Sequence, residues 1–231
     1  MSRLALMIDL ERCTGCKSCE VACKTEHGLG PGERRNRVLW LPGETLNGAA
    51  RPALDFLTLA CQHCDRPACL RACPVHPKAI TKDAATGVVQ VHEDQCVGCG
   101  ECVAACPYGA MGYDADGHHA VKCDLCVDRR TEAAARGETA TTACASVCPG
   151  KAIRFGERDL LLAEAEAEGR KLVDNDPWLL EPATLYLDRL IGEAQAFSAE
   201  GRAMPAISDS GTFEEEPSAY PFRAPRAERL P

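Results

Sequence analysis

Sixteen cysteines in four groups of four dominate this 231-residue sequence, and no cysteine lies outside a group. The groups are Cys13, Cys16, Cys19 and Cys23; Cys61, Cys64, Cys69 and Cys73; Cys96, Cys99, Cys102 and Cys106; and Cys123, Cys126, Cys144 and Cys148. In the bacterial [4Fe–4S] pattern, three closely spaced thiolates hold one cluster and the fourth ligates the other cluster of a pair. The grouping therefore predicts four [4Fe–4S] clusters, an arrangement suited to carrying electrons.

The same crossing rule assigns the ligands. The second and third groups are adjacent and pair as one dicluster ferredoxin, so the first and fourth groups pair across them. The predicted iron ligands are Cys13, Cys16, Cys19 and Cys148 (set 1); Cys23, Cys123, Cys126 and Cys144 (set 2); Cys61, Cys64, Cys69 and Cys106 (set 3); and Cys73, Cys96, Cys99 and Cys102 (set 4). Because every ligand is cysteine, no [3Fe–4S] site is expected.

Three other kinds of cysteine site fit the spacing less well. Structural zinc takes two separated pairs in a closed tetrahedron, whereas two of these groups begin with three cysteines at Cys-x2-Cys-x2-Cys. Disulfide frameworks are typical of small secreted chains with a signal peptide, and residues 1–10 of this sequence do not resemble one. A thioredoxin-like redox pair would be one motif rather than four. The cluster interpretation is favoured over all three.

Composition narrows the class of protein. Aromatic residues make up only 5% of the chain, which suits an interior partly filled by clusters whose binding supplies folding energy. The net charge of −8 argues against a nucleic-acid surface. The sequence contains no stretch of about 18 apolar residues, so it predicts no membrane-spanning helix. Residues 1–10 do not read as a signal peptide, so a reducing cytoplasm is the expected compartment, with export alongside a signal-bearing partner left open.

A repeated unit predicts the fold class. Strand-like runs precede the four groups at residues 4–10, 54–60, 88–91 and 119–122. A Cys-Pro step closes three groups, and a second short apolar run follows at residues 79–80, 110–111 and 152–153. Proline stops the short helix that carries the fourth cysteine, because the residue before proline disfavours the α region. The sequence predicts an α+β fold of two nested dicluster-ferredoxin-like modules.

We expect a polyferredoxin domain over residues 1–156, with an outer module at 1–24 plus 118–156 and an inner module at 53–114. Residues 28–52 are rich in glycine and proline and predict a long surface loop, and residues 133–136 predict a helical stretch. Residues 157–231 predict a C-terminal, partner-binding extension. It would contain helices near 160–169 and 184–200 and an extended tail over 201–231.

Charged residues near the cysteine loops are weaker signals. A nearby cation raises a cluster's potential, but we expect most of these side chains to be ordinary surface charges: Lys17, Lys24, Arg66, Arg71, Lys78, Lys122 and Lys151. The six histidines are expected to be structural or to face solvent, because cysteine already supplies every ligand. The sequence shows no nucleophile, general base or phosphate loop, so we predict no catalysis by this chain alone.

The cysteine groups and their neighbours resemble a known family. Residues 13–24 (CTGCKSCEVACK), His63-Cys64, and residues 122–126 (KCDLC) resemble the iron–sulfur subunits of molybdopterin oxidoreductases over about residues 3 to 158. Two departures stand out: Lys24 rather than proline follows Cys23, and the insert before Cys144 is longer than is usual. The resemblance implies a wire between a large molybdopterin-binding catalytic subunit, with molybdenum or tungsten, and a quinone-linked membrane subunit or soluble carrier. It also implies that the outer cluster pair faces the catalytic subunit.

Two functional classes stay open from the sequence. The first is an electron-transfer subunit of a larger oxidoreductase. The second is a stand-alone polyferredoxin, or an electron-transfer subunit of a hydrogenase or of a tungsten aldehyde oxidoreductase.

Overall fold

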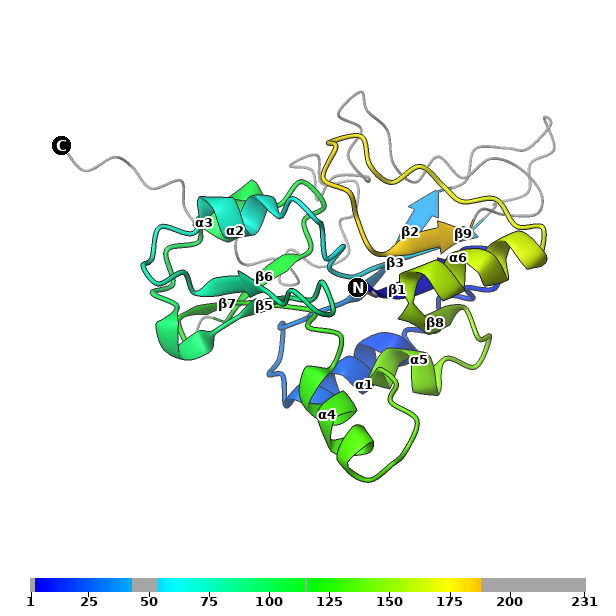
Figure 1. Cartoon of the computed structure of the whole chain (residues 1–231), viewed down its shortest axis with the longest axis horizontal. Coiled ribbons are helices and arrows are strands. Elements are labelled where there is room, and N and C mark those ends of the chain that lie inside the picture. The colour runs from blue at the N-terminus through cyan, green and yellow to red at the C-terminus, as the bar shows by residue number, and fades with distance from the viewer. Residues whose placement is uncertain (1–2, 43–53, 115, 188–231) are drawn as a thin grey trace.

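The computed structural model describes residues 3–42, 54–114 and 116–187 as a mixed α and β fold of short helices and small sheets, as predicted (Figure 1). Its largest sheet has β1 (Leu4–Asp9) at the centre. β8 (Ile153–Glu157) pairs with β1 antiparallel, and β9 (Leu185–Leu187) pairs with it in parallel. Helix α6 (Arg158–Ala167) covers this sheet, and Leu161 packs with residues of β1 and β9 in one buried cluster. The two ends of the described chain are thereby joined.

Three two-stranded antiparallel ladders complete the strands of the described residues. They are β2 (Arg37–Pro42) with β3 (Leu54–Leu59), β4 (Ile80–Lys82) with β5 (Val89–Val91), and β6 (Met111–Asp114) with β7 (His119–Lys122). The strands predicted before the cysteine groups are confirmed as β1, β3, β5 and β7, and those predicted after the Cys-Pro steps as β4, β6 and β8.

Short helices bring the cysteine groups together in pairs (Figure 1). Helix α1 (Ser18–His27) of the first group packs against α5 (Ala143–Val147) of the fourth. Helix α2 (Ala68–Ala72) of the second group packs against α3 (Glu101–Ala105) of the third. A 3-10 turn at Glu93–Gln95 leads into the third group, and α4 (Val127–Ala135) follows Cys126.

The Cys-Pro steps end the helices one residue earlier than predicted. Cys73, Cys106 and Cys148 each lie immediately after a helix and adopt extended backbone angles, with ψ values of 118°, 108° and 110°. The following proline disfavours the α region at these cysteines. Cys23 is followed by lysine instead, so α1 runs past it to His27. The proline thus fixes where the fourth cysteine leaves the helix.

Three sequence predictions need correction. The loop predicted over residues 28–52 contains β2, and its apolar run from Val38 was the missed signal. The helix predicted from residue 184 is wrong for Leu185–Leu187, which form β9, while residues 188–200 lie outside the described part. Apolar residues on one side suit a strand equally well when a partner strand is available. The helix predicted at 133–136 begins earlier, at Val127.

The predicted helix near 160–169 is confirmed as α6, and the predicted tail over 201–231 lies outside the described residues.

A buried ion pair fixes the turn ahead of the first cysteine loop. Asp9 is 1% exposed, and Arg170 donates two hydrogen bonds to its carboxylate at 2.8 and 2.9 Å. The backbone N–H groups of Glu11 and Arg12 also donate to Asp9 Oδ1, at 3.0 and 3.2 Å. Two parallel bonds from one guanidinium are the strong form of this contact. Asp9 therefore ties the segment after α6 to the loop that starts at Cys13.

Within the described residues, no helix is both long and apolar enough to cross a membrane.

Candidate iron–sulfur cluster sites

Set 1 lines a single cavity at the end of β1. Cys13, Cys16 and Cys19 come from the first loop and the start of α1, and Cys148 joins them from the residue after α5. Cys16 is exposed and Cys19 is buried. The pKa of Cys19 is raised to about 12, mainly by burial and further by the neighbouring thiol of Cys144. The cavity therefore brings Cys148, from the fourth group, next to the loop of the first group.

Set 4 lines a second cavity, beside the β4–β5 hairpin. Cys96, Cys99 and Cys102 come from the third group, and Cys73 of the second group completes the lining. Cys99 is exposed and Cys102 is buried. Burial raises the pKa of Cys102 to about 12, with Cys96, Cys99 and Cys73 adding to the shift.

Set 3 lies in the buried centre of the protein. Burial raises the pKa of Cys64, and Cys61, Cys106 and Cys69 raise it further. The pKa of Cys69 rises to about 12 for the same reason, with Cys61 and Cys106 again contributing. Cys106, a member of the third group, packs against the buried cluster that contains Cys61 and Cys64 and against the one that contains Cys69.

Set 2 is buried throughout. Burial raises the pKa of Cys23 to about 12, and Cys144 and Cys126 raise it further. Burial also raises the pKa of Cys123 well above its ordinary value, with Cys144 and Cys23 contributing. Helix α1, which carries Cys23, packs against α5, which carries Cys144, and His27 one turn after Cys23 lies 3.8 Å from Cys126 Sγ.

The donor chemistry of these sites fits iron–sulfur clusters. All sixteen cysteines are free thiols, and neither cavity has a carboxylate or imidazole in its lining. A buried thiol with a pKa near 12 holds its proton at neutral pH, and iron binding replaces that proton because the thiolate is the ligand. Four sulfur donors with nothing harder beside them are typical of iron–sulfur ligation.

A buried histidine supports the same fit. His63 lies between Cys61 and Cys64, is 1% exposed, and accepts a hydrogen bond at Nδ1 from the backbone N–H of Val89 at 3.0 Å. That bond assigns the ring proton to Nε2. In the part of the chain that the structure describes, Nε2 has no hydrogen-bond partner. The unpartnered Nε2–H of His63, close in sequence to Cys61 and Cys64, suits a hydrogen bond to a sulfide of a bound cluster, an acceptor that the protein itself does not supply.

The cysteine loops turn through the left-handed backbone region. Positive φ angles occur at Gly15, Lys17, His63, Gly98, Gly100, Leu125 and Cys126. Such turns point successive N–H groups to one side and favour a bound anion. At Gly98, a Cβ atom would lie 2.3 Å from the backbone oxygen of His118, so only glycine fits.

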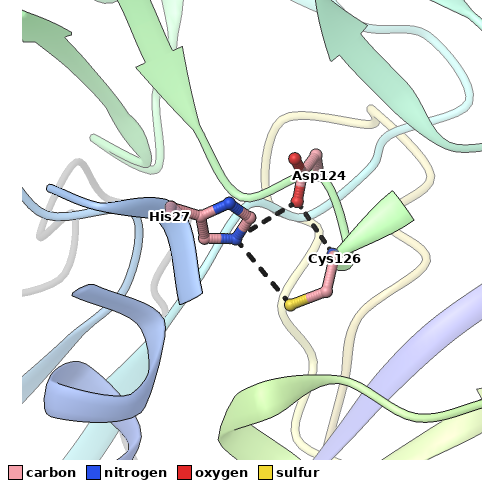
Figure 2. A group of neighbouring side chains, drawn as sticks. All are labelled: His27, Asp124 and Cys126. Carbon is pink, nitrogen blue, oxygen red and sulfur yellow. Dashed lines mark hydrogen bonds and ion pairs between the residues drawn. The ribbon is translucent and has the colours of Figure 1, made fainter. Parts of the chain in front are cut away.

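His27, Asp124 and Cys126 gather beside set 2 (Figure 2). His27 Nε2 lies 3.6 Å from Asp124 Oδ1 and 3.8 Å from Cys126 Sγ. Asp124 accepts the Cys126 N–H at 2.8 Å and a bond from Arg35 at 2.9 Å. These three side chains could hold an ion, but set 2 needs the same sulfur. We interpret His27 and Asp124 as neighbours that orient Cys126.

Sequence reasoning missed this group. His27 follows Cys23 by four residues, which places both on one face of α1, and Asp124 lies between two cysteines. Those two spacings were the available signals.

Comparison with known proteins places the chain in a family. A 4Fe-4S dicluster domain matches residues 52–158, and a 4Fe-4S binding domain matches residues 4–25. One chain of the anaerobic dimethyl sulfoxide reductase of Escherichia coli (strain K12) is 37% identical over 165 residues, covering 69% of this sequence and 76% of the relative. The protein belongs to the iron–sulfur electron-transfer subunits of the dimethyl sulfoxide reductase family.

Two further relatives are subunits of a sulfite dehydrogenase and of a thiosulfate reductase. A subunit of the sulfite dehydrogenase of Allochromatium vinosum is 34% identical over 206 residues, covering 82% of this sequence and 84% of the relative. The thiosulfate reductase electron transfer subunit PhsB of Salmonella typhi is 35% identical over 159 residues, covering 68% and 78%. The predicted resemblance is confirmed, and so is the prediction that the chain is an electron-transfer subunit rather than a catalytic one.

Proposed function

We propose that the chain relays electrons through four [4Fe–4S] clusters, one in each of sets 1 to 4. The relay would run between a catalytic subunit with a molybdenum or tungsten bis-pterin and a quinone-linked membrane subunit or soluble carrier. Each cluster supplies a site that takes up and gives back one electron.

The exposure of the cysteines carries this proposal. The exposed thiols belong to sets 1 and 4, at Cys16 and Cys99. Set 2 is buried, and set 3 is buried apart from the half-buried Cys106. One buried cluster holds Cys19 of set 1 with Cys144 of set 2 and Cys61 of set 3, and another holds Cys69 of set 3 with Cys102 of set 4. Two buried sets between two accessible ones support a relay in the order 1, 2, 3, 4, with electrons exchanged at its ends.

The nested arrangement is part of the proposal. The pairing of β1 with β8 and the packing of α1 on α5 support an outer module of residues 1–24 plus 118–156. The packing of α2 on α3 and the β4–β5 hairpin support an inner module within residues 53–114. Strand β6 of the inner module pairs with β7 of the outer module, so the two modules form one structure. By analogy with the family, the outer module would face the catalytic subunit and association with a membrane would be through a partner.

An electron count tests the relay. Coulometric titration of the anaerobically purified chain should show uptake of about four electrons, one for each cluster, between the limits of about −700 and +450 mV that proteins impose on such clusters. Each step should be reversible and should have an electron paramagnetic resonance signal. A chain that accepts no electrons in this range would contradict the proposed function.

A truncation tests the partner-binding extension. Residues 158–187 pack on β1 through α6 and β9, so the truncation should begin at residue 188. Affinity purification of the full chain should recover a large molybdopterin-binding subunit, and deletion of residues 188–231 should reduce that recovery several-fold. Iron content is the internal control and should not change. Equal recovery by the truncated chain would exclude this segment from the interface.

A further inference from the structure

Lys122 is a buried lysine at the end of β7, although its sequence context predicted a surface charge. Its exposure is 3%, and its ammonium donates to the backbone oxygen of Val89 and, at 2.6 Å, to that of Cys123. Val89 belongs to the inner hairpin, and Cys123 belongs to set 2. Lys122 therefore spans the junction between the two proposed modules.

The charge of Lys122 has no carboxylate partner among the residues that the structure describes. Its two acceptors are carbonyl groups, which satisfy N–H donors but carry no net charge. A buried, uncompensated ammonium is strongly unfavourable, so natural proteins pair such a charge. The missing counter-charge points to an anion that belongs to the loaded protein.

The surroundings identify set 3 as the source of that anion. Lys122 pairs with Met111 across β6 and β7, and Met111 packs in one buried cluster with Val89, with Cys69 of set 3, and with Cys73 and Cys102 of set 4. Val89, whose backbone oxygen accepts from Lys122, also donates its N–H to His63 Nδ1 at 3.0 Å, and His63 lies between Cys61 and Cys64 of set 3. The ammonium therefore lies beside the loop of Cys61 and Cys64, and a cluster with four thiolate ligands is anionic.

We propose that Lys122 is the counter-ion of the cluster held by Cys61, Cys64, Cys69 and Cys106, and that its charge raises that cluster's reduction potential. The inference rests on the proposed function, because it requires a cluster in set 3. A fixed cation favours the reduced cluster, which carries one more negative charge. Lys122 is a positioning and tuning residue, and it ligates no iron.

The test compares three variants by cluster content and by the midpoint potential of each cluster, followed by electron paramagnetic resonance. Lys122→Gln removes the charge and keeps a donor, whereas Lys122→Arg keeps the charge. Lys151→Asn is the matched control, because Lys151 is an exposed lysine close to Cys148 and solvent screens its charge. The iron content of the unmodified chain is measured first, and about 16 iron atoms per chain would show that all four sets, including set 3, hold a cluster. Failure of the proposed function would appear in that measurement, before any Lys122 variant is compared.

In Lys122→Gln we expect one cluster to change its reduced-to-oxidised ratio at least tenfold toward the oxidised form, about 59 mV for one electron. Lys122→Arg should restore most of that shift, and Lys151→Asn should leave all potentials unchanged. Loss of the cluster in Lys122→Gln but not in Lys122→Arg would also support the proposal, because arginine keeps the positive charge that glutamine lacks. Unchanged potentials in Lys122→Gln, or failure of both Lys122 variants to load, would give Lys122 a purely structural role.

Discussion

Replacement of Cys106 by serine is expected to disrupt the cluster of Cys61, Cys64 and Cys69 and to leave Cys96, Cys99 and Cys102 as ligands of an intact one. The expected result follows from the position of Cys106, which lies directly after α3 at a Cys-Pro step and packs against the buried clusters that contain Cys61, Cys64 and Cys69. A hydroxyl is a poorer ligand for iron than a thiolate. Iron content should fall from about 16 to about 12 per chain if the damaged cluster is lost entirely.

Double variants make the assignment of Cys106 sharper. Cys64→Ser combined with Cys106→Ser should remove no more iron than either single change, because both cysteines hold one cluster. Cys102→Ser combined with Cys106→Ser should remove two clusters, about eight iron per chain. Cys73→Ser is the matched control, since it should damage set 4 instead. The reverse pattern of iron loss would mean that each sequence group holds its own cluster.

Replacement of Arg170 by methionine should lower the free energy of unfolding by about 3 kcal/mol, the lower end for a broken buried pair, because the buried carboxylate of Asp9 then keeps only its 3.4 Å contact with the half-exposed Arg12. Anaerobic chemical denaturation of the cluster-loaded protein measures the loss. The double variant Asp9→Asn with Arg170→Met should recover part of it, since no charge is then stranded. A loss below about 1 kcal/mol, as for an exposed pair, would show that the ion pair does not hold this turn.

The pH dependence of this loss has a defined sign. Burial alone would raise the pKa of Asp9, but the hydrogen bonds and charge of Arg170 bring it below its ordinary value. A lowered folded-state pKa contributes stability above the unfolded pKa of about 3.9, and that stability is lost as the pH falls through the folded pKa. The difference between the wild-type protein and Arg170→Met should therefore be the same at about pH 6 and about pH 8. A difference that changed across this interval would require another titrating group.

Features with local signals were predictable from the sequence. The Cys-Pro steps predicted where three helices end, because proline restricts its own neighbour whatever the tertiary context. The short strands around each group followed from alternation and were confirmed. The assignment of cysteines to clusters stays a prediction, although the two cavities bring together Cys148 with the first group and Cys73 with the third.

Features that depend on distant partners were not predictable. Leu185–Leu187 form a strand that pairs with the edge of β1 opposite β8, whereas the same apolar spacing also suits a helix. Lys122 has the composition of a surface residue, and its burial follows from the packing of β5 on β7. The ion pair of Asp9 with Arg170 joins positions too far apart in the chain for any local pattern to connect.

Iron and acid-labile sulfide analysis of the anaerobically purified chain tests the central claim most directly. If sixteen thiolates hold four cubanes, each chain should contain about 16 iron atoms and about 16 sulfide ions. About four zinc ions per chain, with no sulfide and no visible absorption, would contradict the account, because tetrahedral zinc sites with four cysteine ligands each would then occupy the same thiols.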